Sequence, residues 1–253
     1  MKLLDVGGHT LYPTLGIFGM SGVGKTSLAA TAGKLIIADS NEGTMSLDHV
    51  PEYAGEIKRV RIHDMKDLSR LHDNLTGTGN QNWKKKKFRA VSLDHFDDIQ
   101  QIILAKLAER AEDNREEPDL IEQREWGIMA NKLRRYLRLM KRLPMTKILV
   151  MGEKFMEQEG WMYPSLQGQM RDALPYFCDH VIYVRMSSKG VRYLHLDPKP
   201  GEFYAKTRAW WLTPEERKIR FDLDNKTLLA DLIEKIRRGP SGDDRRKTRR
   251  KKK

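Results

Sequence analysis

The segment that most constrains the fold is residues 19–26, Gly-Met-Ser-Gly-Val-Gly-Lys-Thr, which directly follows the apolar run 15–18. It fits the pattern G-x-x-x-x-G-K-[ST], and its flanks predict a strand before it and a helix after it. Glycines allow the backbone N–H groups of such a loop to turn inward around phosphate oxygens, because no Cβ blocks the turn. The segment therefore predicts a phosphate-binding loop rather than an ordinary glycine-rich turn.

The residues of this loop have expected roles in binding ATP. We expect Lys25 to bridge the β- and γ-phosphates and the Thr26 hydroxyl to hold Mg²⁺. The helix that begins at Lys25 points its positive end at the same phosphates. The predicted ATP-binding residues are Gly19, Met20, Ser21, Gly22, Val23, Gly24, Lys25, Thr26 and Ser27.

A second motif, Ala90-Val-Ser-Leu-Asp94, is an apolar strand that ends in a carboxylate. We expect Asp94 to lie beside the phosphate loop and to hold Mg²⁺ directly or through water. Asp97 and Asp98 are more simply the start of the next helix, where acidic side chains interact well with the helix dipole. Thr26 and Asp94 are thus the predicted magnesium ligands, and Asp94 with Lys25 belongs to the predicted catalytic set.

Hydrolysis also requires a group that positions or deprotonates water near the γ-phosphate. The polar segment 39–42 follows the apolar run 35–38 and would lie next to the phosphate loop in a parallel sheet. Glu42 is the first candidate for this base and Asp39 the second. A polar turn around Gly43 with no catalytic role is the alternative.

The order of the remaining segments predicts an α/β fold. Apolar or alternating runs typical of strands alternate with helical patterns, so the sheet is expected to be mostly parallel and covered on both faces. Further strands near the end of the chain predict antiparallel additions to that sheet, whereas residues 152–168 read as a loop. The predicted strands are 14–19, 35–38, 59–62, 88–93, 147–151, 180–186, 191–197, 203–212 and 218–223, and the predicted helices are 65–75, 97–111, 120–143 and 225–237.

The net charge of +12 is unevenly distributed. Residues 240–253 contain eight Lys or Arg and two Asp, so they contribute +6, half of the excess. This distribution favours a polyanionic partner, most simply nucleic acid, although a solubilising tail is the alternative. We interpret residues 1–238 as one domain and residues 239–253 as a disordered basic tail.

Two features bear on the compartment. The single cysteine, Cys178, excludes an intramolecular disulfide framework and fits a reducing environment. No apolar run approaches the roughly 20 residues that a membrane span needs, and the N-terminal residues lack the apolar core of a signal peptide. The expected location is the cytoplasm, with no membrane partner.

On these motifs the chain resembles the phage-encoded RecA-like P-loop ATPases, the group that includes single-strand annealing and recombination ATPases. The resemblance spans residues 12–223. It implies a RecA-like core that hydrolyses ATP with Mg²⁺, forms a homo-oligomer, and acts on single-stranded DNA together with phage replication or recombination proteins. The segments that carry it are 19–26, 37–43, 91–94, the helix around Trp126-Gly127, and 164–183.

Within this resemblance, some positions depart from the pattern of the family. The register after the second strand carries an extra residue, so Asn41 is an alternative to Glu42 for the water-positioning slot. His95 stands where a small hydroxyl residue is common. Glu153 is the nearest match to the polar residue that follows the fifth strand and senses the γ-phosphate.

Lys206 and Arg208 are similar to the Lys-x-Arg pair of RecA-like ring ATPases. In those proteins both cations reach the γ-phosphate of the neighbouring subunit, where they neutralise transition-state charge. The resemblance therefore implies that the active unit is an oligomer, with Lys206 and Arg208 acting on a neighbour's nucleotide.

Aromatic side chains in the segment 152–168 offer a contact for single-stranded DNA. Phe155, Trp161 and Tyr163 lie near Lys154, a combination that stacks on bases and follows a phosphate backbone. The alternative is that these aromatics pack the segment onto the body of the domain.

Two other function classes stay open at this point. One is a small-molecule kinase, although the sequence lacks an obvious Arg-rich lid. The other is a non-hydrolysing nucleotide switch that recruits replication proteins through the basic tail.

Overall fold

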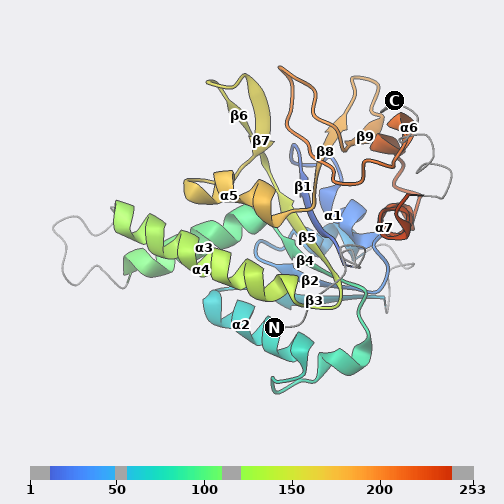
Figure 1. Ribbon diagram of the computed structural model, residues 1–253. Coiled ribbons are helices and arrows are strands. Elements are labelled where there is room, and N and C mark those ends of the chain that lie inside the picture. The colour runs from blue at the N-terminus through green and yellow to red at the C-terminus, as the bar shows by residue number, and fades with distance from the viewer. Residues whose placement is uncertain (1–11, 49–55, 110–120, 241–253) are drawn as a thin grey trace, which may run out of the picture.

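The structure, a computed structural model that describes residues 12–48, 56–109 and 121–240, is built on an eight-stranded sheet (Figure 1). The strand order is β10-β9-β8-β1-β5-β4-β2-β3. All neighbours from β8 to β3 are parallel, whereas β9 runs antiparallel to both β8 and β10. The strands are β1 (Thr14–Phe18), β2 (Leu35–Asp39), β3 (Ile57–Arg61), β4 (Ala90–Asp94), β5 (Thr146–Met151), β8 (His180–Met186), β9 (Arg192–His195) and β10 (Lys218–Phe221).

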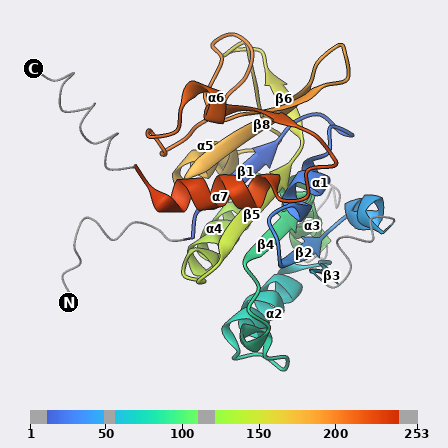
Figure 2. The ribbon, with the colours of Figure 1, turned by 90° about the vertical axis from the view of Figure 1, so that its right-hand side faces the viewer.

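Helices cover both faces of this sheet. One face packs against α2 (Met65–Thr76), α3 (Phe96–Glu109), α4 (Gln123–Lys141) and α5 (Gln169–Phe177). The other face packs against α1 (Lys25–Ala30) and α7 (Leu228–Arg238), and Figure 2 looks onto the side that α7 crosses. The short helix α6 (Pro214–Arg217) precedes β10. The predicted α/β class is confirmed: a mostly parallel sheet is flanked by helices and ends in antiparallel strands.

The central strands are mostly apolar because both of their faces are buried, and their polar residues lie mainly at the strand ends. Every residue of β1, β2, β4 and β5 is buried. Successive side chains of a strand point to opposite faces, so Ile17 joins the core under α1 and α7, while Phe18 joins the core under α3 and α4. Largely apolar, fully buried runs of this kind are typical of parallel strands between two helix layers.

The helix predicted at 65–75 shows how local signals set an element. The Asp64 side chain accepts hydrogen bonds from the backbone N–H groups of Lys66 and Asp67, at 2.7 and 3.0 Å, and so caps α2. The helix ends at Gly77, whose φ of 83° suits glycine. In between, α2 buries the stripe Leu68, Leu71 and Leu75 against the core.

Three segments differ from their predicted conformation. Residues 152–168 form an antiparallel hairpin of β6 (Glu153–Met156) and β7 (Trp161–Pro164), which projects beyond the sheet (Figure 1). Its strands have four residues each, too few for a clear alternating pattern. Helix α5 was not predicted because Pro175 interrupts its pattern. Residues 203–212 form isolated bridges at Phe203 and Lys206 instead of a regular strand.

The predicted basic tail falls almost wholly outside the described residues, which end at 240, so its disorder stays a prediction. Among the helices that the structure describes, none is both long and apolar enough to cross a bilayer.

Candidate nucleotide-binding site

The phosphate loop connects the carboxyl end of β1 to α1 and packs closely against β8. A Cβ atom at Gly19 would collide with the carbonyl oxygen of Val184, so only glycine allows this approach. Gly24 has a φ of 91°, a left-handed conformation that favours glycine, and it is the residue from which α1 begins. The pattern of glycines in the sequence is thus explained by two separate demands, close packing at Gly19 and backbone conformation at Gly24.

Lys25 lies buried in this loop. Its Nζ donates hydrogen bonds to the carbonyl oxygens of Gly19 and Met20, at 2.9 and 2.8 Å. Burial lowers the pKa of the Lys25 ammonium, and the carboxylates of Asp97, Asp94 and Glu153 oppose that shift. The cation is therefore held at the phosphate loop with three acidic side chains around it.

The two predicted magnesium ligands are in direct contact. The Thr26 hydroxyl donates to Oδ2 of Asp94 at 3.0 Å, across 68 positions of sequence. Asp94 is fully buried at the end of β4, and burial raises the pKa of its carboxyl, while His95 and the Thr26 hydrogen bond lower it. A hydroxyl and a carboxylate at the mouth of a phosphate loop are oxygen donors of the kind Mg²⁺ prefers. These residues fit the predicted ion.

The second strand brings Asp39 beside Asp94, with which it pairs in register. Asp39 is buried and accepts hydrogen bonds from the Thr44 hydroxyl and from the backbone N–H of Asn41, the latter at 3.2 Å. Its carboxylate therefore already holds the turn that follows β2.

The Glu42 side chain does not point toward Lys25 of the phosphate loop. The backbone of Glu42 is left-handed, with a φ of 64°, and its side chain forms an ion pair with Arg61 of the edge strand β3. The Glu42 side chain is 53% exposed, and it is not among the acids that shift the pKa of Lys25. Asn41, the alternative for the same slot, donates from Nδ2 to Asp98 at 2.7 Å.

Two acids that the sequence left in minor roles lie closer to the loop. Asp97 accepts hydrogen bonds on Oδ2 from the Gly152 N–H, at 3.0 Å, and from the Ser165 hydroxyl. Its other oxygen, Oδ1, and the Oε2 of Glu153 are both buried and have no hydrogen-bond partner among the described residues. Burial and the neighbouring Glu153 carboxylate raise the pKa of the Tyr183 hydroxyl. Within the described residues, two carboxylate oxygens near Lys25 thus lack a partner. Both acids follow a strand in the sequence, and Glu153 also matches the γ-phosphate-sensing position that the resemblance implied.

Arg192 is a further residue at the loop that sequence reasoning missed. Its Nε donates to the carbonyl oxygen of Val23 at 3.1 Å. A Cβ at Gly24 would lie 3.2 Å from the Phe221 ring and 3.7 Å from Arg192. The antiparallel strands β9 and β10 therefore close the outer side of the phosphate loop. One arginine in a chain with 47 Lys and Arg gives no sequence signal of this role.

Comparison with known proteins agrees with this geometry. A family model described as an AAA domain matches residues 12–209. The chain belongs to this AAA domain family. Membership identifies it as a P-loop nucleotide-binding ATPase domain, which confirms the coarser part of the resemblance seen in the sequence.

Two further searches, against curated proteins and solved structures, gave no match of comparable strength for this AAA domain. No curated protein matches the sequence at a significant level. Among solved structures, the chain is similar to a KaiC-like protein from the hyperthermophilic archaeon Pyrococcus horikoshii, with 13% identity, a TM-score of 0.48, and coverage of 85% of this chain and 87% of that one.

Lys206 and Arg208 lie away from the AAA domain's own phosphate loop. Lys206 donates from Nζ to the carbonyl oxygens of Pro175 and Cys178, the latter at 3.2 Å, at the end of α5. Arg208 pairs with Asp179 at 3.1 Å, just before the first residue of β8. Since the phosphate loop lies at the carboxyl ends of the parallel strands, neither cation reaches it within one chain. The Arg208 side chain is 56% exposed, and the predicted action on a neighbour's nucleotide stays a prediction.

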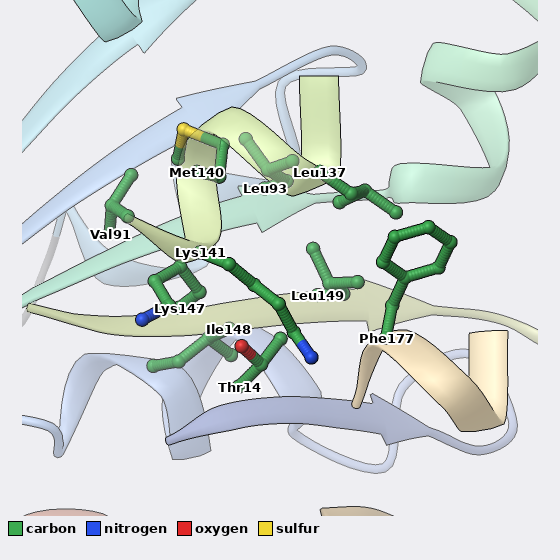
Figure 3. Close-up of a pocket in the computed structure, with 10 residues that line it drawn as sticks. All are labelled: Thr14, Val91, Leu93, Leu137, Met140, Lys141, Lys147, Ile148, Leu149 and Phe177. Atoms are coloured by element: carbon green, nitrogen blue, oxygen red, sulfur yellow. The ribbon is translucent and has the colours of Figure 1, made fainter. Parts of the chain in front are cut away.

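A small cavity between the sheet and α4 lies apart from the phosphate loop. Figure 3 shows side chains from β1, β4, β5 and α4 around it, with Phe177 of α5. Its volume is about 10 Å³, about enough for one water molecule and far too small for a nucleotide. The lining is mostly apolar, with Lys141 and Lys147 on one side.

Proposed function

We propose that this AAA domain hydrolyses ATP with Mg²⁺ and acts on single-stranded DNA as a homo-oligomer, in recombination, annealing or replication of the phage type. One observation carries the DNA part of the proposal: the aromatic β6–β7 hairpin begins at Glu153, one of the acids around Lys25. A strand bound on the hairpin would therefore lie next to a group that faces the nucleotide.

The nucleotide chemistry follows from the loop. Backbone N–H groups of residues 19–26 and the Lys25 ammonium would bind the phosphates, and Thr26 with Asp94 would hold Mg²⁺. When bound, this ion neutralises charge on the phosphate oxygens. The loop and its acids thus account for binding and charge neutralisation.

Deprotonation of the attacking water needs a basic group with a free acceptor atom, such as a carboxylate oxygen. Glu42 was the predicted group, yet its carboxylate pairs with Arg61. Glu153 has a buried oxygen with no partner within the described ranges, and it acts on Lys25. The geometry favours Glu153, with Asp97 beside it, over Glu42.

The hairpin offers surfaces for bases. Phe155 is 51% exposed, and Lys154 next to it is also exposed. Trp161 stacks on Tyr163 with ring centroids 6.4 Å apart, and Tyr163 stacks on Tyr204 at 5.2 Å. The hairpin therefore combines aromatics packed toward the body with one aromatic that projects into solvent. Exposed aromatic and cationic side chains together are typical of single-strand binding.

The deciding experiment measures phosphate release from ATP with and without an oligo(dT) strand, in Mg²⁺ and after its removal by EDTA. We expect turnover that needs Mg²⁺ and rises with DNA. Phe155→Ala should lose most of the DNA stimulation, while Tyr176→Ala, which removes an exposed aromatic on α5, should keep it. Equal turnover with and without DNA at all salt concentrations would overturn the DNA part.

The same assay separates the two alternatives. Phosphate release without an added acceptor argues against a small-molecule kinase. Tight ATP binding without turnover, even with DNA present, would instead favour a non-hydrolysing switch.

A further inference from the structure

We infer that a second surface, the recess between the β8–β10 strands and residues 197–203, takes a nucleotide unit of the bound single strand. This inference rests on the proposed function and adds a binding site to it. The recess has a volume of about 470 Å³, within the range of small-molecule sites. Its lining residues are Arg185, Ser187, Tyr193, His195, Asp197, Pro198, Lys199, Phe203, Pro214, Arg217 and Lys218.

The floor of the recess is aromatic. Tyr193 and His195 lie two positions apart on β9, so both point to the same face of the sheet. The ring centroids of His195 and Phe203 are 4.8 Å apart, and those of Tyr193 and His195 are 6.3 Å apart. The buried core on this face ends at Tyr183 and Phe203, which leaves the β9 rings partly open to solvent. A planar base has ring faces to contact here.

The rim of the recess is cationic. Arg185 and Lys199 share Glu202 as an ion-pair partner, and Arg217 pairs with Asp197 at 3.3 Å. Lys218 differs from them: its Nζ lies 5.3 Å from the centre of the Tyr193 ring. It forms no ion pair with any residue that the structure describes. Four cations face two carboxylates, so the recess favours an anion.

One polar atom on the floor lacks a partner. Nε2 of His195 is buried and has no hydrogen bond within the described part of the chain. Burial, with Lys218 and Arg185 nearby, lowers the pKa of His195 to about 4, so the ring is neutral at physiological pH. An unsatisfied buried imidazole nitrogen costs free energy, and a base edge or a phosphate oxygen that displaces the side chain covering it would satisfy it.

Aromatic rings, cations and an unpaired imidazole together suit a nucleotide, with its base on the floor and its phosphate at the rim. The source could be a strand or a free mononucleotide, and the connection to the hairpin favours the strand. The Met162 N–H of β7 donates to the Glu202 carbonyl oxygen, and the Tyr204 N–H donates to the Met162 carbonyl oxygen, both at 2.9 Å. The chain that carries Phe203 is thus bonded to the hairpin, and a strand leaving the hairpin meets the recess next.

The test measures the affinity of a fluorescein-labelled oligo(dT) by anisotropy for four purified variants, each checked for wild-type thermal unfolding. Tyr193→Ala should weaken binding roughly five- to 100-fold, the effect typical of losing one base stack. Tyr193→Phe keeps the ring and should bind like wild type. Lys218→Ala should weaken binding. It should also reduce by about 1 the slope of the logarithm of the binding constant against the logarithm of the salt concentration. Lys66→Ala removes an equal charge on α2, which packs beside β3 at the far end of the sheet, and should have little effect.

Photocrosslinking locates the contact directly. Oligo(dT) that contains 4-thiothymidine should crosslink to residues of β9 or to Phe203, as mapped by mass spectrometry. Crosslinks confined to the β6–β7 hairpin, or a Tyr193→Ala variant that binds like wild type, would overturn the recess while leaving the proposed function intact. Crosslinking by free 4-thio-dTMP but not by the strand would overturn the strand as ligand. Wild-type protein that binds no oligo(dT) would overturn the DNA-acting function itself.

Discussion

The hydroxyl of Thr26 donates a hydrogen bond to the carboxylate of Asp94, and this contact joins the first turn of α1 to the end of β4. Asp94 is fully buried, and the burial raises the pKa of its carboxyl. A carboxyl held in this way is costly to the folded chain, so its presence is better explained by ion binding than by stability.

We expect Asp94→Asn to stabilise the protein measured without nucleotide or Mg²⁺. A carboxyl whose pKa is raised on folding destabilises the folded state once it ionises. The gain should be roughly 0.5–2 kcal/mol at pH 7 and should shrink as the pH falls toward the ordinary aspartate pKa. Urea unfolding at several pH values measures it, with Asp172→Asn as an exposed control. The same variant should bind Mg²⁺-ATP at least tenfold more weakly. A loss of stability at pH 7 in the Asp94→Asn variant contradicts this assignment.

Glu153→Gln should lower turnover by roughly 100-fold or more while ATP binding changes little, the pattern of a lost general base. Glu42→Gln should lower turnover only a few-fold, because its carboxylate pairs with Arg61. Steady-state ATPase assays and a fluorescent-nucleotide binding assay separate the two effects. A larger loss of turnover in Glu42→Gln than in Glu153→Gln would instead assign the general base to Glu42.

Arg208→Ala should leave nucleotide binding intact and lower turnover, since the side chain is exposed and lies far from its own loop. Lys25→Ala should lose nucleotide binding or turnover. Mixing the two variants should give more activity than the sum of the separate proteins if Arg208 acts on a neighbour's nucleotide. Lys206→Ala is a poorer choice, because that ammonium bonds carbonyl oxygens at the end of α5 and its loss would also weaken the fold. A mixture with no recovered activity counts against a shared site.

His180 should make the fold sensitive to mild acid. Burial lowers the pKa of this histidine to about 4, and its Nδ1 lies 2.8 Å from the Thr207 hydroxyl. A histidine with a depressed pKa supports the fold above its ordinary pKa of 6.5, and that support is lost as the pH falls from there toward 4. At pH 5 the loss should be about 2 kcal/mol relative to pH 7.5. His180→Gln should flatten this part of the stability profile, measured by urea unfolding, whereas the exposed His63→Gln should not. An unchanged slope in the His180→Gln variant would exclude this origin.

The extent to which sequence predicted this structure differs between elements. The phosphate loop was predictable because it combines a hydrophobic strand with a specific pattern of glycines, Lys25 and Thr26. Strand β4 and Asp94 were predictable because an apolar run that ends in a carboxylate follows that loop in the sequence. Helix α2 was predictable from its cap and its apolar stripe. In contrast, α5 was missed since Pro175 masks its period, and the β6–β7 hairpin was missed since its strands are short.

Some contacts of the nucleotide-binding site could be predicted from the sequence, and others could not. The contact between Thr26 and Asp94 follows from motif and strand order. The direction of the Glu42 side chain does not, because it depends on a left-handed backbone and on Arg61 from another strand. Arg192 reaches the loop only because β9 folds back beside β8, which is a property of the tertiary structure.

Tyr183 lies between Glu153, an acid near the phosphate loop, and Phe203, a lining residue of the recess. The Glu153 carboxylate acts on the Tyr183 hydroxyl, and the centroid of the Tyr183 ring lies 4.5 Å from that of Phe203. If a strand in the recess shifts this ring, it changes the surroundings of the acid near the nucleotide. Thermodynamic linkage then requires symmetry: the factor by which DNA changes ATP affinity equals the factor by which ATP changes DNA affinity. A single tyrosine would thus allow the protein to hold DNA more or less tightly according to the nucleotide it carries.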